Sequence, residues 1–309
     1  MPIKIPDDLP ARKTLEDEGV DLIAEHDAIK QDIRPLRIAL LNLMPEKIKT
    51  ETQLARIIGA SPLQVEIKLI TTASYIPSNT PREHMLAFYV PWEEVAEEKF
   101  DGLIVTGAPV EEIDFEDVDY WKELTQIFDW AETNVHSSFN ICWGAQAALY
   151  HRYGLPKHLL PRKLSGVFPH RINRRSASIV RGFNDIIPVP VSRYTEMRRR
   201  DVEKHDTLEV LIESSDAGIC LVKDHATGDI HMFNHLEYDS RTLGDEYSRD
   251  MRARPDTVHV PQHYYPEDDP ALIPANTWRA HGHLLFANWI NATYQSAPFD
   301  KKDIGKDRN

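Results

Sequence analysis

The stretch SFNICWGAQAALY, residues 138–150, contains the turn on which the predicted fold depends. Phe139 to Cys142 form a short apolar run typical of a buried strand, and the residues from Gly144 onward favour a helix. A buried strand that leads straight into a helix is a unit of a parallel sheet covered by helices. Cys142 occupies the turn between the two, where a side chain is exposed at the carboxyl edge of the sheet.

The rest of the chain continues this alternation. Apolar runs predict strands at 36–43, 64–70 and 100–106, and helical spacing predicts helices at 48–59, around 84–89 and at 116–134. The second half predicts short strands at 179–180, 187–191, 208–212, 218–222 and 230–233, with helices at about 240–252 and 277–294. Together these elements predict an α/β fold with a mostly parallel central sheet and helices on both faces.

We expect a single mixed domain over residues 34–297, because no repeat, low-complexity tract or linker interrupts it. Residues 1–33 are expected to form an N-terminal arm with one or two short helices. Residues 298–309 are expected to form a disordered tail.

The formal net charge of the 309 residues is −13, which argues against general binding to nucleic acid or to an anionic membrane. An anionic ligand would therefore need a locally basic site. The N-terminus lacks the apolar core of a signal peptide, and no run of 18 apolar residues predicts a spanning helix. Two cysteines suit a reducing compartment, so we expect a cytoplasmic protein.

Cys142 is the candidate nucleophile. The amides and dipole at the N-terminus of the following helix favour a thiolate and lower the pKa of the thiol. The amide of Trp143 is expected to point into the same space and to stabilise a tetrahedral oxyanion. From the local pattern alone, a buried structural cysteine fits as well as a nucleophile. Cys220 lies in the middle of a predicted strand and is interpreted as structural.

A cysteine nucleophile needs a base, and the segment HMFNHLEYD offers one. His235 and Glu237 are two residues apart at a predicted strand end, so in an extended chain their side chains face the same way. The carboxylate would hold the imidazole in one tautomer while the other ring nitrogen faces the thiol. His281 and His283 suggest a metal pair, but no third ligand is apparent and we expect no metal site.

The chain order Cys142, His235, Glu237 resembles the class I glutamine amidotransferase-like fold, a flavodoxin-like three-layer sandwich. That resemblance alone permits an amidase, a protease-like enzyme or an acyltransferase. Longer segments resemble the homoserine O-acyltransferase family of methionine biosynthesis, from about residue 1 to 297. They are NLMPEKIKTETQLARIIG (42–59), FDGLIVTGAPVE (100–111), ICWGAQAALYHRYG (141–154), NHLEYD (234–239) and NTWRAHGHLLFANWIN (276–291). His-Leu-Glu in place of the His-Pro-Glu common in amidotransferases favours this family.

This resemblance implies that Cys142 takes the acyl group from an acyl-CoA, with His235 as general base and Glu237 as its support. The hydroxyl of L-homoserine would then attack the thioester, which gives ping-pong kinetics. The resemblance implies no bound cofactor, with acetyl-CoA or another acyl-CoA as co-substrate, and neither a nucleic-acid nor a membrane partner. A homodimer is expected only because dimers are the commonest soluble oligomers.

Lys163, Ser192 and Arg249 match substrate-binding residues of that family. A guanidinium can bind the homoserine carboxylate with two hydrogen bonds, and Lys163 can bind that carboxylate or an oxygen of the acyl donor. Ser192 can contact a polar group of the substrate. Taken singly, each is more often a solvated surface residue. The basic residues of the stretch 162–175 either attract CoA phosphates or form a solvated face; they are Arg162, Lys163, Arg171, Arg174 and Arg175.

Glu111, directly after TGAPV, bears on the acyl donor. In the family, a glutamate here accompanies acetyl-CoA and a glycine accompanies succinyl-CoA. A carboxylate fills the acyl pocket and repels the free carboxylate of a succinyl group, by about 1 kcal/mol at ~4 Å in water and more in a drier site. We therefore predict acetyl transfer. Alternatively, Glu111 only continues the acidic surface of Glu112 and Asp114. Succinyl-CoA is the alternative acyl donor.

Two other functions stay open on the sequence. One is a glutamine amidase or peptidase of the same fold, and the other is a non-catalytic sensor, although a sensor needs no set of Cys, His and Glu. The amides of Leu43 and Met44 are candidates for the second oxyanion donor. Lys47 either touches CoA or, as a lysine at a helix start, is solvated.

Overall fold

The computed structural model describes residues 3–18, 20, 22–23, 34–74 and 79–305. Its strands are β1 (Ile3–Lys4), β2 (Leu22–Ile23), β3 (Leu36–Leu41), β4 (Val65–Thr71), β5 (Val90–Pro91), β6 (Phe100–Val105), β7 (Val135–Ile141), β8 (His158–Ile172), β9 (Ile186–Glu196), β10 (Leu208–Ser214), β11 (Gly218–Asp224) and β12 (Ile230–Met232). The helices are α1 (Ala11–Asp17), α3 (Lys47–Gly59), α4 (Arg82–Phe88), α5 (Trp121–Asn134), α6 (Trp143–Tyr153), α7 (Arg199–Val202), α8 (Thr242–Ala253) and α9 (Arg279–Ser296).

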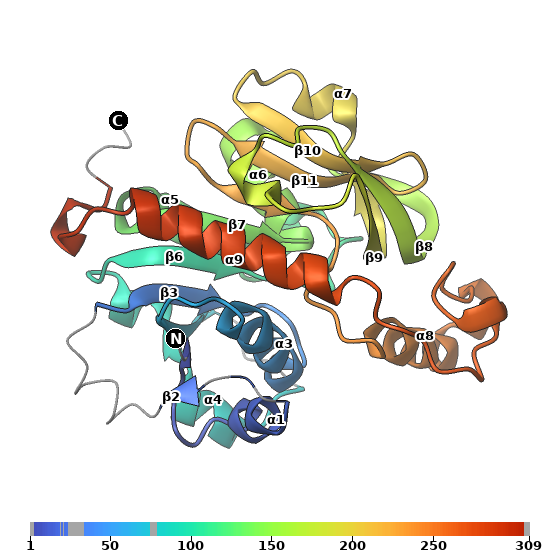
Figure 1. Cartoon of the computed structure of the whole chain (residues 1–309), viewed down its shortest axis with the longest axis horizontal. Coiled ribbons are helices and arrows are strands. Elements are labelled where there is room, and N and C mark those ends of the chain that lie inside the picture. The colour runs from blue at the N-terminus through green and yellow to red at the C-terminus, as the bar shows by residue number, and fades with distance from the viewer. Residues whose placement is uncertain (1–2, 19, 21, 24–33, 75–78, 306–309) are drawn as a thin grey trace.

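The strands form one mixed sheet in the order β2-β1-β4-β3-β6-β7-β12-β11-β10-β8-β9, and β5 pairs with β4 (Figure 1). Neighbouring strands from β2 to β12 are parallel, whereas β12, β11, β10, β8 and β9 pair antiparallel to one another. The predicted α/β fold with a mostly parallel sheet is confirmed. Strands β6, β7 and β12 are adjacent and parallel, so their carboxyl ends meet at one edge.

Helices cover both faces of the parallel half. Ile38 and Leu40 of β3 belong to the same core as apolar side chains of α3 and α9, whereas the intervening Ala39 and Leu41 belong to the core under α5 and α6. This alternation of side chains across a strand is what a three-layer sandwich requires. Figure 1 shows α9 running along one face of the sheet, and the Trp289 indole of α9 donates a hydrogen bond to Ser137 Oγ of β7 at 3.0 Å.

One strand was missed, and two predicted elements were wrong in type or extent. Residues 158–172 form the 15-residue strand β8, which no predicted element covered. Its sequence, HLLPRKLSGVFPHRI, carries prolines and charges instead of a clear alternation, and its pairing with β9 shifts register between Leu159 and Leu164, around Pro161. The predicted strand at 179–180 is part of a 3-10 helix, Ser178–Val180. The helix predicted at 116–134 begins only at Trp121, after a 3-10 turn at Phe115–Asp117.

The described terminal residues join the main body. Strand β1 pairs with β4, and Ile5, Leu9 and Leu15 are buried in the core with α3. Near the other end, residues 301–303 form a 3-10 turn and Ile304 is buried. Part of the expected arm, residues 24–33, and the end of the expected tail, residues 306–309, lie outside the described residues, and the domain boundaries stay a prediction. Among the helices that the structure describes, none is long and apolar enough to cross a membrane.

A tight contact between α6 and the end of β6 fixes the turn at Cys142. A Cβ atom added to Gly144 would lie 2.5 Å from the carbonyl oxygen of Thr106 and 3.0 Å from that of Val105. Only glycine lets the first turn of α6 approach these backbone atoms. Cys142 itself has φ 50° and ψ −120°, a conformation that is costly for a residue with a side chain. The strand-to-helix turn predicted from the sequence is therefore present and strained.

We predict that Gly144→Ala lowers the free energy of unfolding by about 1–3 kcal/mol, because the added methyl group meets backbone carbonyls that cannot move independently of β6. Urea denaturation measures this loss. Gly154→Ala is the matched control, since Gly154 has φ 66° but open space around it. It should cost roughly 1 kcal/mol and leave alkylation of Cys142 unchanged. If Cys142 is alkylated at the same rate in wild type and in Gly144→Ala, the contact between α6 and β6 does not fix the turn at Cys142.

Candidate active site

Cys142 lies where the carboxyl ends of three parallel strands converge. It follows β7, its amide donates a 2.6 Å hydrogen bond to the Met232 carbonyl at the end of β12, and Gly107 follows the end of β6. A Cβ atom added to Gly107 would lie 3.1 Å from the Cys142 Cβ and 3.6 Å from its Sγ. The amide of Trp143 donates to the sulfur, as the sequence predicted for an oxyanion donor. Gly107 was not singled out from the sequence, although it follows a predicted strand.

His235 and Glu237 lie together in a turn after β12. The His235 Nδ1 atom is 2.7 Å from Glu237 Oε1, and the imidazole also hydrogen-bonds the Cys142 thiol. Two contacts hold the histidine: its amide donates to the Pro190 carbonyl at 3.0 Å, and its ring stacks on Tyr238 with 4.1 Å between ring centres. The contact predicted between the two side chains is present. The predicted reason was wrong, because the chain turns here and is not extended.

Burial and charge shift the pKa values of this pair. Burial raises the pKa of the Cys142 thiol, while His235 and the Trp143 amide act in the opposite direction. Burial disfavours a charged imidazole, but Glu237 and Cys142 outweigh it and hold the pKa of His235 well above its usual value. A raised imidazole pKa makes His235 a good acceptor for the thiol proton. The geometry is that of a cysteine beside an oriented base, but the net shift of the thiol pKa is upward because burial outweighs the helix N-terminus that was expected to lower it.

Glu111 faces the thiol. Its Oε1 atom is 4.0 Å from Cys142 Sγ, and its Oε2 atom accepts a 3.2 Å hydrogen bond from the Tyr194 amide. Lys157 donates to the Glu111 carbonyl at 2.7 Å, which fixes the loop after β6. Burial raises the pKa of Glu111 to about 7. The alternative in which Glu111 only continues an acidic surface is therefore wrong.

Lys163 and Ser192 meet at a carboxylate on α8. Lys163 Nζ is 3.3 Å from Glu246 Oε2 and 2.7 Å from Asp250 Oδ2, and Ser192 Oγ donates to the same Glu246 oxygen. Burial raises the pKa of Glu246, but Lys163, Ser192 and Tyr238 outweigh it, so the net shift is downward. Ser192 and Lys163 are largely covered, so their interpretation as solvated surface residues is wrong.

Arg249 lies at the edge of the cluster formed by Lys163, Glu246 and Asp250. Its guanidinium hydrogen-bonds Asp250 at 2.9 Å, and 60% of its side chain is exposed, so it can turn toward a ligand. Sequence reasoning missed Glu246 and Tyr238, whose hydroxyl donates to Glu246 Oε1 at 2.7 Å. Glu246 is three residues before Arg249 in a predicted helix, which places both on one face. That spacing was the available signal.

A buried polar chain supports the turn that carries His235. Arg193 Nη1 donates to Asn234 Oδ1 at 2.6 Å, and Asn234 Nδ2 donates to His170 Nε2 at 2.9 Å. His170 Nδ1 then donates to the Phe168 carbonyl at 2.9 Å. Burial lowers the pKa of His170 to about 4, so its imidazole is neutral at pH 7 and can accept from the amide. Asn234, the residue before His235, is thereby fixed from both sides.

Several other sequence candidates lie apart from the thiol or are already bonded. The amide of Leu43 donates to Thr106 Oγ1 at 2.7 Å and that of Met44 to Asn42 Oδ1 at 3.1 Å, so neither is free for an oxyanion. Lys47 is 3% exposed and donates to the Asn42 carbonyl, so its interpretation as solvated is wrong. Cys220 is buried in β11, and burial raises the pKa of its thiol to about 12.

The two histidines considered as a metal pair have different surroundings. His281 packs edge-on against the Phe183 ring at 5.4 Å, and His283 lines a hollow beside Arg56 and Arg279. Within the described ranges, no group of three or more His, Cys, Asp and Glu side chains is arranged to hold a metal ion.

Comparisons with known proteins indicate the family and the fold. The family model described as homoserine O-succinyltransferase matches residues 2–299. A protein named homoserine O-acetyltransferase from Hyphomonas neptunium is 58% identical over 306 residues, covering 99% of this chain and 100% of that one. One of the same name from Agrobacterium fabrum is 56% identical, covering 99% of each chain. A glutamine amidotransferase structure from Thermotoga maritima has a TM-score of 0.55 at 12% identity, covering 85% of this chain and 100% of that chain.

We predict that His235→Asn slows alkylation of Cys142 by iodoacetamide at pH 7 by about tenfold or more. The substitution removes the group that lowers the pKa of the thiol, and one pKa unit changes the thiolate fraction tenfold. Mass spectrometry of the modified peptide distinguishes Cys142 from Cys220, which should stay unmodified in the folded protein. His225→Asn, which alters an exposed histidine paired with Glu209, is the control. Unchanged kinetics in His235→Asn would contradict the assigned pair.

Proposed function

The chain belongs to the homoserine O-succinyltransferase family, and we propose that it transfers an acetyl group from acetyl-CoA to the hydroxyl of L-homoserine, a step toward methionine. The observation that carries the proposal is that Cys142 contacts His235 and Glu111 at one sheet edge and that Glu237 in turn contacts His235. The names of relatives at 53–58% identity support acetyl as the acyl group. We also propose that the protein is cytoplasmic, since the proposed substrates are intracellular metabolites.

In the first half-reaction, Cys142 Sγ attacks the thioester carbonyl of acetyl-CoA while His235 accepts the thiol proton. The oxyanion forms beside the Trp143 amide, which already points at the sulfur. Collapse of the tetrahedral intermediate breaks the carbon–sulfur bond to CoA, and the proton returns from His235 to the departing CoA thiolate. Cys142 is left as an acetyl thioester.

In the second half-reaction, His235 accepts the hydroxyl proton of homoserine as its oxygen attacks that thioester. Collapse releases O-acetyl-homoserine, and the proton returns to the Cys142 sulfur. Glu237 keeps the imidazole oriented in both halves through its 2.7 Å contact with Nδ1. No metal or bound cofactor takes part in these steps, and acetyl-CoA serves as co-substrate.

Glu246 and Arg249 on α8, together with Lys163 on β8, fit the charged ends of homoserine. The carboxylate of homoserine would take Lys163 and Arg249 as partners, and its ammonium would take Glu246. Glu246 keeps its negative charge because Lys163, Ser192 and Tyr238 lower its pKa despite burial. Tyr238 connects this group to the base, since its hydroxyl bonds Glu246 and its ring stacks on His235. Homodimer formation stays a prediction.

Succinyl-CoA is the second candidate donor, because the matching family model carries that name. Glu111 argues against it, since its carboxylate lies 4.0 Å from the sulfur that would carry the acyl group. A succinyl group would bring a second carboxylate into the same partly buried space. An amidase is supported only by structural neighbours at 12–16% identity, which show the fold alone.

We predict that acetyl-CoA labelled in the acetyl group leaves a base-labile adduct on Cys142 when homoserine is omitted, and that homoserine releases it as O-acetyl-homoserine. Intact-protein mass spectrometry measures the adduct. Cys142→Ser should form none within a comparable time, while Cys220→Ser, the matched control, should label like wild type. An adduct of equal size in Cys142→Ser would rule out this mechanism.

We predict that Glu111→Gly lowers the acetyl-to-succinyl ratio of kcat/KM by at least about tenfold, because it removes both bulk and charge from the acyl site. Asp114→Gly, at an exposed position of the same loop, should leave the ratio unchanged. Glu111→Gln keeps the bulk and removes only the charge, so it separates the two effects.

The charge effect should also depend on pH. Because the pKa of Glu111 is about 7, its carboxylate is mostly neutral at pH 6 and mostly charged at pH 8. Discrimination against succinyl-CoA in the wild type should therefore strengthen as pH rises from 6 to 8, and Glu111→Gln should lose this dependence. A wild-type ratio that stays flat over this range would show that bulk alone sets the preference.

A further inference from the structure

A cavity of about 300 Å³ opens beside the site, between β8, β9 and the segment from α8 to His259. It adjoins the site at Tyr194, which lines the cavity and whose amide binds the Glu111 carboxylate that faces Cys142. Lys163 also lines the cavity, with its Nζ 5.7 Å from the centre of the Tyr194 ring. A ligand in this cavity would therefore lie next to residues that contact the surroundings of the reacting sulfur.

The walls of the cavity combine apolar and basic side chains. Leu159, Pro161 and Val258 form an apolar part, and Leu159 is 63% exposed. Arg162 and Arg254 provide positive charge at the same cavity. A cavity with such walls suits a ligand that is uncharged along its length and anionic at its outer end.

The charges around the cavity leave Arg162 available. Among the described residues, the carboxylates at the cavity already have cations: Asp250 binds Lys163 and Arg249, and Glu112 lies 3.6 Å from Arg254. Arg162 is exposed and forms no ion pair with any described residue. In a chain of net charge −13, an arginine without a carboxylate partner beside the active site is a ready partner for a phosphate.

The rest of the basic stretch is at the other end of β8. Arg171, Arg174 and Arg175 border a different hollow, and Arg174 and Arg175 are paired with Glu209 and Asp185. Arg171 lies nine positions after Arg162 along the extended strand, which is a distance of roughly 30 Å. The basic stretch 162–175, treated in the sequence as one possible phosphate-binding surface, is therefore two separate groups, and only Arg162 and Lys163 line the cavity beside the active site.

We propose that this cavity holds the pantetheine arm of the acyl-CoA, with Arg162 binding its phosphates at the outer end. The inference rests on the proposed function, because it takes the acyl donor to be a CoA thioester. Arg162 is assigned as a binding residue and takes no part in the chemical steps at Cys142.

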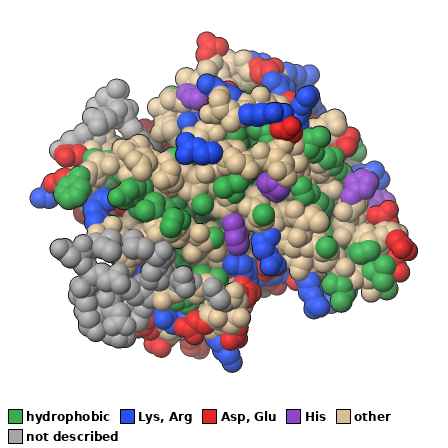
Figure 2. All heavy atoms as spheres, in the orientation of Figure 1, with side chains coloured by type: hydrophobic (Ala, Val, Ile, Leu, Met, Phe, Trp, Pro, Cys, Tyr) green, Lys and Arg blue, Asp and Glu red, His purple; other side chains and the backbone are tan. Residues whose placement is uncertain are grey.

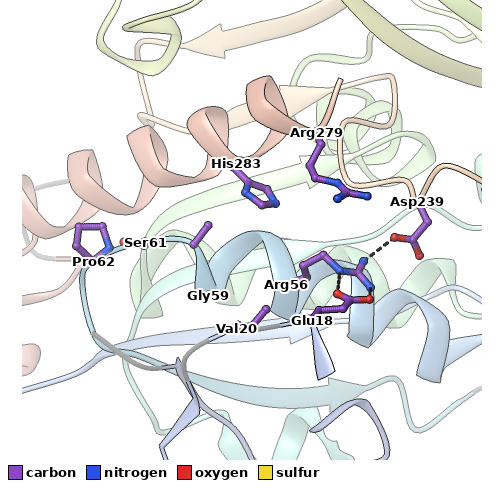
Figure 3. A pocket seen from close by; sticks show the side chains of 10 residues that line it. Glu18, Val20, Arg56, Gly59, Ser61, Pro62, Asp239, Arg279 and His283 are labelled. Carbon is purple, nitrogen blue, oxygen red and sulfur yellow. Dashed lines mark hydrogen bonds and ion pairs between the residues drawn. The ribbon is translucent and has the colours of Figure 1, made fainter. Parts of the chain in front are cut away.

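A second hollow provides a matched control. On the face in Figure 2, histidine and basic side chains gather below α9, and a hollow of about 790 Å³ lies there between α9 and α3. In Figure 3, Arg279 and His283 extend from α9 toward Arg56, which is bonded to Glu18 and Asp239. Arg279 is exposed like Arg162, but the described residues that line this hollow include none of those that line the cavity at Lys163. Replacing Arg279 removes one positive charge, as replacing Arg162 does, but it does not alter the cavity at Arg162.

The test compares acetyl-CoA with S-acetylpantetheine, which has the arm but lacks the phosphates. In Arg162→Ala, the ratio of kcat/KM for acetyl-CoA to that for S-acetylpantetheine should fall by roughly five- to tenfold. The KM for homoserine should not change. Arg279→Ala should keep the wild-type ratio. A ratio unchanged in Arg162→Ala, or lowered equally in Arg279→Ala, would overturn the phosphate assignment.

Val258→Trp tests the path of the arm itself. A bulkier wall should lower kcat/KM for both donors by a similar factor of about tenfold, with the KM for homoserine and the thermal midpoint of unfolding unchanged. Full activity with both donors would place the arm elsewhere.

Failure of the proposed function gives a different result. If the wild type transfers acetyl from neither donor to homoserine, the function is wrong, and calorimetric titration with CoA then decides the site alone. Weaker CoA binding in Arg162→Ala than in Arg279→Ala would retain it, and equal binding would refute it.

Discussion

The strained turn at Cys142 is the constraint on which the rest of the site depends. A positive φ at a residue with a side chain persists only where the surroundings hold it. Here the Cys142 amide is bonded to the end of β12, and Gly144 lets α6 approach the carbonyl oxygens of Val105 and Thr106. Three strand ends and a helix therefore fix one sulfur atom. The strain raises the thiol to the sheet edge, where the base and the acyl donor can reach it.

The position of the base follows from the same arrangement. Because β12 is parallel to β7, the turn after β12 begins beside the turn that carries Cys142. The hydrogen bond from the His235 amide to Pro190 and the stacked Tyr238 ring then fix the imidazole. Tyr238 also bonds Glu246, so the base and the group assigned to homoserine share one support. An antiparallel β12 would have placed this turn at the opposite edge of the sheet.

The sequence predicted the parallel half of the fold well, because buried parallel strands are continuous apolar runs and the helices between them are strongly periodic. The sequence did not predict β8, because prolines and charged residues interrupt its alternation. Its partners are β9, which follows a long turn, and β10, which lies far along the chain. For the site, Cys142, His235 and Glu237 follow strand ends, which a local pattern can reveal. Glu246 accepts hydrogen bonds from Lys163 and Ser192, which are distant from it in the sequence, so these residues meet only in the folded chain.

The electrostatics of the site agree with acetyl-CoA as the donor, because its phosphates are anionic and the acetyl group that reacts is uncharged. The chain as a whole is strongly acidic, so attraction of a phosphate has to be local. At the thiol, the environment is partly buried and the nearest carboxylate, Glu111, has its pKa raised to about 7 by that burial. A small uncharged acetyl group enters such a space at little cost, whereas a second carboxylate would either be desolvated beside Glu111 or force one of the two to take up a proton. The same burial thus raises the pKa of Glu111, which bears on the acyl group selected, and that of the Cys142 thiol, where His235 and the Trp143 amide oppose it.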